Sequence, residues 1–278
     1  MLRQKPRDEF LVSTKIGRVL TPFDGKPEDK DFGFQASGLP FDLNVTYDLE
    51  GVTRAYEDCM TRLGVNSIDS IVVHDLDRKH NPIEADFQRY MSQMKKGFPM
   101  LEALRAAGKI GAIGAGINEK SCIKDWLDNF DIDYFIIAMP YTLLDQEVLD
   151  KEFLEIEKRG VGIVLGAPFA SGILATGAIE GARYNYAPAS PEILAKVRKI
   201  EAVCANNKTP LKAAALQFPM GHPNVVSIIP GPANETQLCE NIEMLKFKIP
   251  AQFWAEMKHA KLLHERAPIP TGFDIPDL

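Results

Sequence analysis

Short apolar runs alternate with helical segments along the chain, and this alternation constrains the fold more than any other feature. Each run is short, rich in β-branched or aromatic residues and nearly continuous in its apolarity, as strands buried on both faces are. The expected strands are residues 10–16, 67–74, 110–117, 134–139, 162–167 and 225–229. Alternating strands and helices predict an α/β fold with a parallel sheet and right-handed crossovers.

Helical periodicity fills the segments between these strands. Asp48 is a candidate N-cap, and Gly64, Gly108 and Gly160 are candidate C-terminal stops. The expected helices are residues 49–63, 98–107, 119–130, 145–159, 191–206, 209–218, 234–245 and 250–266. Residues 17–46 are rich in Gly and Pro. In a barrel they would form a loop over the face that carries the active site. We expect one domain over residues 1–278, with a C-terminal helix and tail over residues 250–278.

The number of strands is unusual for a barrel. A barrel of about 250 residues has eight strands, at roughly 31 residues per strand–helix unit. Six units therefore predict either an open sheet or a barrel from which two units are missing. In the second case we expect an opening between the strand at residues 10–16 and the strand at residues 225–229.

Charge and composition exclude several classes of protein. The net charge of −6 argues against a broad nucleic-acid-binding surface. The longest uncharged stretch, residues 160–179, is interrupted by glycines and Pro168, so no membrane span is expected. The 4 cysteines are widely spaced and no metal-ligand spacing occurs, which favours reduced thiols in a cytoplasmic protein without a metal.

Unusual side chains fall at the ends of the expected strands, where active sites gather in α/β barrels. Lys15 ends the first strand, His74 ends the second, and Asn118, Tyr141 and Phe169 follow the next three. A lysine in an apolar strand is costly unless it is paired or functional, which favours a role for Lys15. His74 taken alone fits a hydrogen-bonded core residue equally well.

The last strand runs into the segment IIPGPANETQLCEN, in which a turn leads to a helix near Asn234. Free N–H groups at a helix N-terminus form an anion site, although a capped helix without a ligand explains the spacing equally well. The segment ASGILATG after Pro168 fits either a flap over a diphosphate or an ordinary loop.

Taken together, these segments resemble the aldo-keto reductases. The resemblance rests on LVSTKIG, SIDSIVVHD, AIGAGINE, AMPYTLLDQ, GAPFASGIL and IIPGPANETQLCENI, which follow in the family's order. Within the family, YTLLDQ and APFASGIL are most similar to the bacterial sugar and pyridoxal dehydrogenases. The resemblance implies a (β/α)₈ TIM barrel of aldo-keto reductase type, incomplete at the N-terminus, with strands 3–8 present.

The resemblance also implies roles for particular residues. Lys15 matches the lysine that lowers the pKa of the family's catalytic tyrosine, and His74 matches the histidine that orients the carbonyl oxygen. Cofactor roles fall on Asn118 for the carboxamide, Phe169 for stacking on the nicotinamide, Tyr141 beside the cofactor, Ser171 and Gly172 over the diphosphate, Gly231, Asn234 and Gln237 at the adenosine phosphate, and Glu240 and Asn241 at the adenine. Because Gly231 and Gln237 are uncharged, NAD is expected over NADP.

One departure from the family pattern limits these expectations. The family's catalytic aspartate and tyrosine lie upstream of its lysine strand, and no FDTAxxYG-like segment occurs in this sequence. One hypothesis is an NAD(P)-dependent oxidoreductase, completed by a further segment, that acts on a sugar or an aromatic aldehyde or alcohol. The alternatives are a catalytically inactive dinucleotide-binding or interaction protein, and a barrel lyase that uses Lys15 as a Schiff base.

Overall fold

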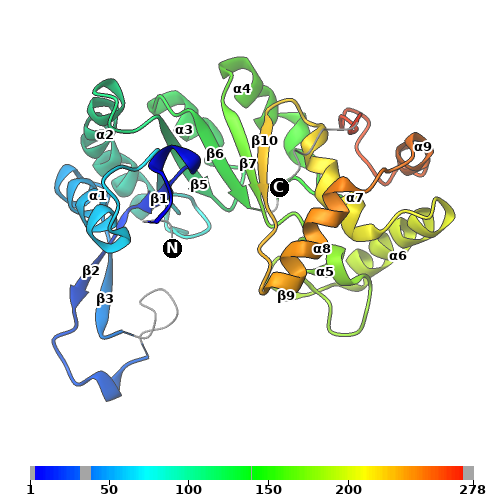
Figure 1. The fold of residues 1–278 in the computed structure, drawn as a ribbon, viewed down its shortest axis with the longest axis horizontal. Helices are drawn as coiled ribbons and strands as arrows, with labels where there is room; N and C mark the ends of the chain where they lie inside the picture. Colours follow the sequence, from blue (N-terminus) through cyan, green and yellow to red (C-terminus); the bar gives the residue numbers. More distant parts are fainter. Residues whose placement is uncertain (1–3, 32–38, 139, 272–278) are drawn as a thin grey trace. The chain divides into compact units, whose positions relative to one another are not determined.

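Six parallel strands run through the residues described by the computed structural model, which are 4–31, 39–138 and 140–271 (Figure 1). The chain divides into two units. The first contains the residues up to Ile117 together with Asp125–Tyr134, and the second contains Asn118–Lys124 and the residues from Phe135 onward. The six expected strands are all present.

The first unit is built on three parallel strands in the order β1-β4-β5. The register places Lys15 opposite Val72 and His74 opposite Gly116. Its elements are η2 (Arg7–Glu9), β1 (Ser13–Ile16), β2 (Arg18–Pro22), η3 (Pro27–Asp29), β3 (Phe41–Val45), α1 (Leu49–Leu63), β4 (Ser70–His74), α2 (Glu84–Ala106) and β5 (Ala112–Ile117). In sequence, α3 (Ile123–Asn129) and β6 (Tyr134–Ala138) each cross from one unit to the other.

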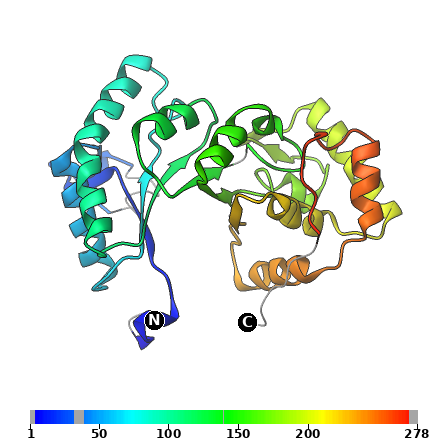
Figure 2. The same ribbon diagram turned by 90° about the horizontal axis from the view of Figure 1, so that it is seen from above.

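Helix α1 begins and ends at the residues that its capping signals predict. The Asp48 carboxylate accepts a hydrogen bond from the backbone N–H of Gly51, as an N-cap side chain does. Gly64 adopts the left-handed conformation, with a φ of 62°, and its N–H donates to the carbonyl of Met60. Figures 1 and 2 show α1 beside α2 in the first unit.

Helix α2 is longer than the helix expected over residues 98–107, because it begins at Glu84. The helix continues through Pro99 although an internal proline costs about 3 kcal/mol. The buried residues that hold it are Phe87, Met91, Met94, Gly97, Phe98 and Leu101. A Cβ on Gly97 would lie 2.4 Å from the carbonyl of Tyr47, so glycine at this position allows α2 to lie close to the start of α1.

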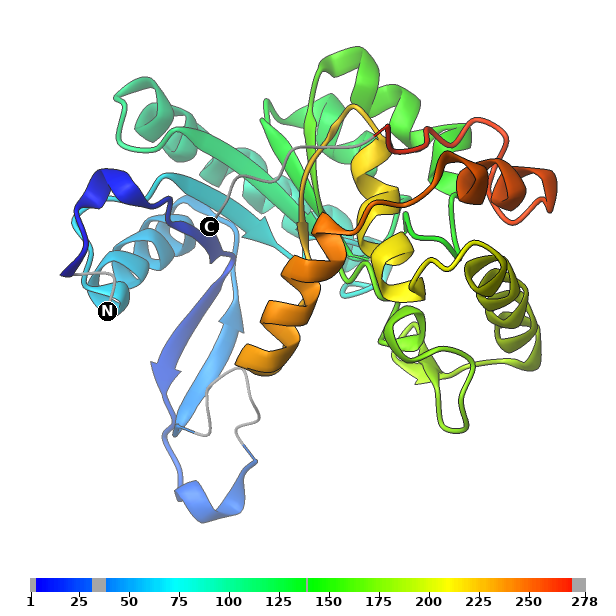
Figure 3. The ribbon, with the colours of Figure 1, turned by 45° about the vertical axis from the view of Figure 1, so that its right-hand side comes forward.

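The prediction that residues 17–46 form only a loop is wrong. Strands β2 and β3 pair antiparallel over these residues, from Arg18 opposite Val45 to Pro22 opposite Phe41. Most of their side chains are exposed or half-buried, so burial leaves no clear apolar pattern in the sequence. Figures 1 and 3 show this hairpin reaching away from β1, and residues 32–38 lie outside the described residues.

The second unit contains strands in the order β6-β7-β10, with β7 and β10 in parallel register. Its further elements are η4 (Glu147–Asp150), α4 (Glu152–Arg159), β7 (Gly162–Gly166), α5 (Ile173–Thr176), β8 (Arg183–Tyr184), β9 (Ala187–Pro188), α6 (Pro191–Asn206), α7 (Leu211–Gln217), η5 (Phe218–Gly221), β10 (Val225–Ile229), α8 (Glu235–Lys246) and α9 (Ala251–His259). Figure 3 shows α7 packed beside α8.

Several expected helices in the second unit are shorter in the structure. The segment at residues 145–159 splits into η4 and α4, and the helix expected at residues 250–266 ends at His259. The helices expected at residues 119–130 and 209–218 contract to Ile123–Asn129 and Leu211–Gln217. The sequence also gave no sign of α5 or of the small β8–β9 hairpin. Met139 and residues 272–278, which belong to an expected strand and to the expected tail, lie outside the described residues.

Strands β1 and β10 are the end strands of their units. Among the described residues, β1 pairs with β4 alone and β10 pairs with β7 alone. Apolar side chains remain exposed there, with Leu11 87% and Val226 62% accessible. No further strand of the described residues pairs with β1 or β10, so the parallel sheet there has six strands. No helix among the described residues is long and apolar enough to span a membrane.

Candidate active site

Lys15 and His74 lie on one face of the sheet in the first unit. Lys15 is opposite Val72, and His74 lies two residues further along β4, so their side chains point to the same side. A strand spacing of about 4.8 Å and an advance of two residues place their Cα atoms about 8 Å apart. Lys15 is exposed, so the burial cost that we expected for this lysine does not arise.

The imidazole of His74 is held in its neutral form. Burial lowers its pKa to about 4, and the charges of Arg18, Lys15 and His80 act in the same direction, while that of Asp75 opposes them. Its Nε2 atom lies 3.3 Å from Oδ2 of Asp75. A neutral imidazole near neutral pH can donate one hydrogen bond to a substrate oxygen without carrying a charge.

An ion pair behind His74 was not predicted from the sequence. Arg18 donates from Nη2 to Oδ2 of Asp75 at 2.5 Å, and both side chains are mostly buried. Asp75 has a φ of 54°, a conformation that aspartate tolerates better than most residues, and it directly follows β4. The two residues are 57 positions apart in the sequence. The only local signal for the pair is that Arg18 closely follows the candidate site residue Lys15, in LVSTKIGR.

Tyr47 also contacts His74, but through the backbone. Its hydroxyl donates to the carbonyl of His74 at 2.7 Å, and its ring packs edge-on against Tyr90. Burial raises the pKa of this hydroxyl well above its usual range. Tyr47 is therefore poorly suited to lose or gain a proton, and it fixes the backbone at the end of β4.

Asp77 and His80 extend the same polar network. Nδ1 of His80 lies 2.8 Å from Oδ1 of the fully buried Asp77, and ligand atoms of Asp75, Asp77 and His80 lie within 4.8 Å of one another. The sequence gave no metal-ligand spacing at these positions. Because Arg18 already holds Oδ2 of Asp75, we interpret the cluster as an ion-paired network.

In the second unit, the turn after β10 uses its predicted residues to cap α8. The side chain of Asn234 accepts from the N–H of Gln237 at 2.9 Å, and Oε1 of Gln237 accepts from the N–H of Ala233 at 2.8 Å. Gly231 adopts the left-handed conformation, and no atom lies within 4 Å of a Cβ built on it. The turn therefore leaves its backbone open on the side of Gly231.

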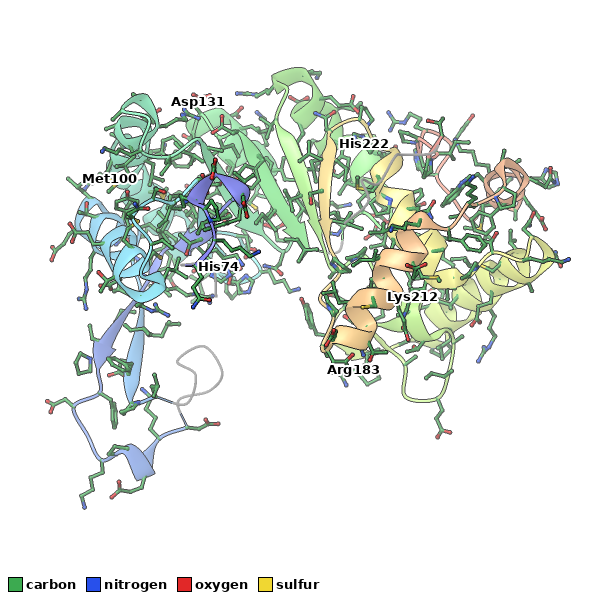
Figure 4. The ribbon with its side chains drawn as sticks, viewed as in Figure 1. His74, Met100, Asp131, Arg183, Lys212 and His222 are labelled. Atoms are coloured by element: carbon green, nitrogen blue, oxygen red, sulfur yellow. The ribbon has the colours of Figure 1, made fainter. Side chains whose placement is uncertain are left out.

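Glu240 and Asn241 lie in α8, one exposed and one buried. Oε2 of Glu240 accepts from Nζ of Lys212 at 2.7 Å, a partner on α7 that was not predicted from the sequence (Figure 4). The Asn241 side chain is 4% exposed. Lys246 and Lys248, by contrast, lie at and beyond the far end of α8, beside Trp254.

Phe169, Ser171 and Gly172 occupy a strained loop after β7. Ala167, Ala170, Ser171 and Gly172 all have positive φ, a conformation that costs non-glycine residues roughly 1–3 kcal/mol each and collects at ligand-binding segments. Oγ of Ser171 accepts from the N–H of Tyr186 at 3.0 Å, which ties this loop to the β8–β9 hairpin. Phe169 is 9% exposed.

Tyr141 lies in a buried aromatic cluster. It is fully buried among Phe153, Phe218 and His222, and its hydroxyl has no hydrogen-bond partner among the described residues. Its position beside the cofactor stays a prediction. Asn118 directly follows β5, is half-buried and belongs to the second unit.

The expected site residues thus fall into two groups, with Lys15 and His74 in the first unit and the cofactor set in the second. The sequence matches the aldo/keto reductase family over residues 1–261. The chain therefore belongs to the aldo/keto reductase family.

Two curated relatives of the chain are named dehydrogenases. The chain is 36% identical to pyridoxal 4-dehydrogenase of Microbacterium luteolum over 272 residues, which are 95% of this chain and 79% of the relative. It is 33% identical to D-threo-aldose 1-dehydrogenase of a Pseudomonas species, over 94% of this chain and 78% of the relative. With the family match, these similarities identify an oxidoreductase of a class that uses a nicotinamide cofactor, NAD or NADP.

Solved structures of the family share the fold. An aldo-keto reductase from Bacillus halodurans in its holo form matches with a TM-score of 0.64 and 18% identity, over 95% of this chain and 78% of its own. The glycerol dehydrogenase from Gluconobacter oxydans matches with a TM-score of 0.67 and 15% identity, over 99% of this chain and 78% of its own. The chain has the aldo-keto reductase fold, a TIM barrel, and its described residues supply a six-stranded parallel sheet.

Proposed function

We propose that this chain supplies the histidine, the lysine and the dinucleotide-binding half of an NAD-dependent dehydrogenase for a sugar or an aromatic aldehyde or alcohol. The observation that carries the proposal is the placement of a neutral His74 and the exposed ammonium of Lys15 on one face of the sheet. Hydride transfer is the chemistry that a bound nicotinamide supplies. The six strands correspond to strands 3–8 of the family barrel.

His74 orients the substrate in this proposal. A neutral imidazole donates a hydrogen bond to the carbonyl oxygen and so polarises the carbon that accepts or loses hydride. The adjacent Asp75 is held by Arg18 at 2.5 Å and gives the imidazole a fixed neighbour.

Lys15 acts through charge. Its ammonium lowers the pKa of a tyrosine hydroxyl that moves a proton to or from the substrate oxygen. The family's Asp and Tyr motif does not occur in the 278 residues, and the buried hydroxyl of Tyr47 is committed to the carbonyl of His74. We therefore expect a segment that carries this Asp and Tyr to be required for full activity.

The cofactor set in the second unit favours NAD. Gly231 and Gln237 carry no charge, and Lys212, the lysine that contacts Glu240, is paired with its carboxylate. Lys246 lies nine residues beyond Gln237 along α8, a rise of about 13 Å, so it does not complement a 2′-phosphate at the turn. The proposed set consists of Asn118, Tyr141, Phe169, Ser171, Gly172, Gly231, Asn234, Gln237, Glu240 and Asn241. Because its cysteines are free, the chain is proposed to act in the cytoplasm.

The names of the relatives point to two substrate classes, pyridoxal and D-threo-aldoses. Assays of a chimaera with both classes distinguish them. A family segment with the Asp and Tyr motif is fused before residue 1, and NADH formation is measured with pyridoxal and with D-threo-aldoses. We expect turnover of at least one substrate class and a large loss of kcat/KM in His74→Ala. Trapping of the substrate on Lys15 by borohydride without NADH formation would instead support a Schiff-base lyase.

A further inference from the structure

A cavity in the second unit has the features of a binding site that the proposed hydride-transfer chemistry does not use. Its volume is 410 Å³, within the range typical of small-molecule sites. Four segments meet around it: the turn at residues 144–147 after β6, Tyr184 of β8, helix α6, and residues 261–264 after α9. None of the residues proposed for hydride transfer or for cofactor binding lines it.

The walls of this cavity are fixed by a buried amide. Gln146 is 6% exposed, and its Nε2 donates to the carbonyl of Thr142 at 2.5 Å. Its Oε1 accepts from the backbone N–H of His264 at 3.0 Å, which joins two segments that are 118 residues apart in sequence. The contact between α6 and α9 supports the same arrangement, and Figure 1 shows these two helices as neighbours. The cavity is therefore formed before any ligand binds.

Lys196 is the residue that indicates which charge a ligand of this cavity carries. It lies on α6, is half-buried, and donates from Nζ to the carbonyl of Leu144 at 3.0 Å. It forms no ion pair with a carboxylate of the described residues, and burial lowers the pKa of its ammonium group. A half-buried ammonium without a carboxylate partner is costly, and an anion in the cavity would supply that partner.

The lining also contains two acidic side chains, Asp145 and Glu147. Glu147 is paired with Lys120 at 2.8 Å, and burial raises the pKa of Asp145. His264 lies 3.3 Å from Asp150. Lys261 is exposed and has no carboxylate partner among the described residues, so two lysines of the lining, Lys196 and Lys261, form no ion pair there.

The rest of the lining is apolar. Leu144, Leu262 and Leu263 are buried, and Ile193 and the ring of Tyr184 are half-buried beside them. Burying an apolar ligand body against such side chains yields about 25 cal/mol per Å². A hydrated inorganic anion would gain no binding free energy from these apolar side chains.

We propose that this cavity binds a small organic carboxylate, whose charged group pairs with Lys196 and Lys261 and whose apolar body packs against Leu144, Ile193 and Leu262. One charged end and one apolar wall fit a monocarboxylate with a short aliphatic or aromatic body. The site is independent of the proposed dehydrogenase function, because it requires neither the nicotinamide nor a catalytic tyrosine.

Calorimetric titration with 3-phenylpropionate tests the site, with 3-phenylpropanol and inorganic phosphate as the neutral and the purely ionic probes. We expect saturable binding of the carboxylate and at least tenfold weaker binding of the other two. Lys196→Met should weaken carboxylate binding at least tenfold, whereas Lys199→Met, an exposed lysine on the same helix, should change it less than twofold. Asp145→Asn should preserve or tighten binding, because it removes the competing carboxyl group.

A second measurement uses the unaltered chain and does not depend on whether a variant folds. Limited acetylation with acetic anhydride, followed by peptide mass spectrometry, reports the reactivity of each lysine. We expect 3-phenylpropionate to slow acetylation of Lys196 and to leave Lys199 unaffected. Equal binding of the alcohol or phosphate, an unchanged affinity in Lys196→Met, or a lack of protection at Lys196 would each overturn the proposal.

Discussion

The end of β4 in the first unit and the turn after β10 in the second use polar side chains in opposite ways. At the end of β4, side chains bind one another: Arg18 holds Asp75, and Asp75 lies beside His74. At the turn after β10, the side chains of Asn234 and Gln237 bind backbone N–H groups. The first arrangement sets protonation states, whereas the second sets the shape of the backbone.

This difference predicts what mutations do in each region. Removing a member of the side-chain network leaves a buried charge behind and changes the electrostatics of His74. Removing a capping side chain leaves an N–H group at a helix end that water can reach. The loss of stability is therefore smaller and confined to that end of the helix.

The largest effect is expected on turnover. The network around His74 contains no hydroxyl that is suited to general acid–base catalysis, a contribution worth roughly 10²–10⁴-fold in rate. The 278-residue chain should therefore oxidise pyridoxal or aldoses about 10²–10⁴-fold more slowly than the chimaera that carries the Asp and Tyr segment. Steady-state NADH formation measures both, and equal rates would show that an acid–base group in this chain was overlooked.

The next effect is on stability, through a pair of matched ion-pair deletions. Arg18 and Asp75 are 18% and 10% exposed, so Asp75→Ala should cost about 3 kcal/mol by leaving a mostly buried guanidinium unpaired. Glu240→Ala removes the partner of Lys212 from a pair in which Glu240 is 53% exposed, and it should cost less than about 1 kcal/mol. Urea unfolding measures both, and similar costs would contradict the contrast.

A pH effect should distinguish His74 from an exposed histidine. The folded pKa of His74, about 4, lies below the unfolded value of 6.5, so the unfolded state takes up the proton first. The stability that His74 contributes is therefore present above pH 6.5 and is lost as the pH falls from 6.5 through 4. His74→Gln should reduce this pH dependence of unfolding, and His259→Gln at an exposed position should leave it unchanged. An NMR titration midpoint of His74 near 6.5 would contradict this assignment.

The smallest effect is expected at the cap of α8. Asn234→Ala removes the oxygen that accepts from Gln237 and should lower the free energy of unfolding by about 1 kcal/mol. Asn234→Asp keeps a capping oxygen and should cost much less. If the two variants unfold alike in urea, the cap does not stabilise this turn.

The elements that were predicted with the correct bounds have local signals. The helices at Leu49–Leu63 and Pro191–Asn206 carry capping residues at their own ends, and the strand Val225–Ile229 is a continuous apolar run. The β2–β3 hairpin and the first half of α2 lack such signals. Their formation depends on contacts with other elements, such as the close approach of Gly97 to the start of α1.

The same distinction applies to the candidate site. Lys15 and His74 could be picked out because each is a polar residue at the end of an apolar strand. Arg18, Tyr47 and Lys212 could not, since their partners lie 57, 27 and 28 positions away. The burial of Tyr141 could not be predicted either, because nothing local indicates that Phe153, Phe218 and His222 pack against its ring.

We propose that the second unit presents a dinucleotide site selective for NAD, and a titration with the two reduced cofactors measures this selectivity. NADH and NADPH are each titrated against the 278-residue chain, with nicotinamide fluorescence as the readout. We expect NADH to bind more tightly than NADPH, and Lys246→Ala to leave both affinities unchanged, because Lys246 lies at the far end of α8 from the turn. Tighter binding of NADPH, or a loss confined to NADPH in Lys246→Ala, would contradict the account.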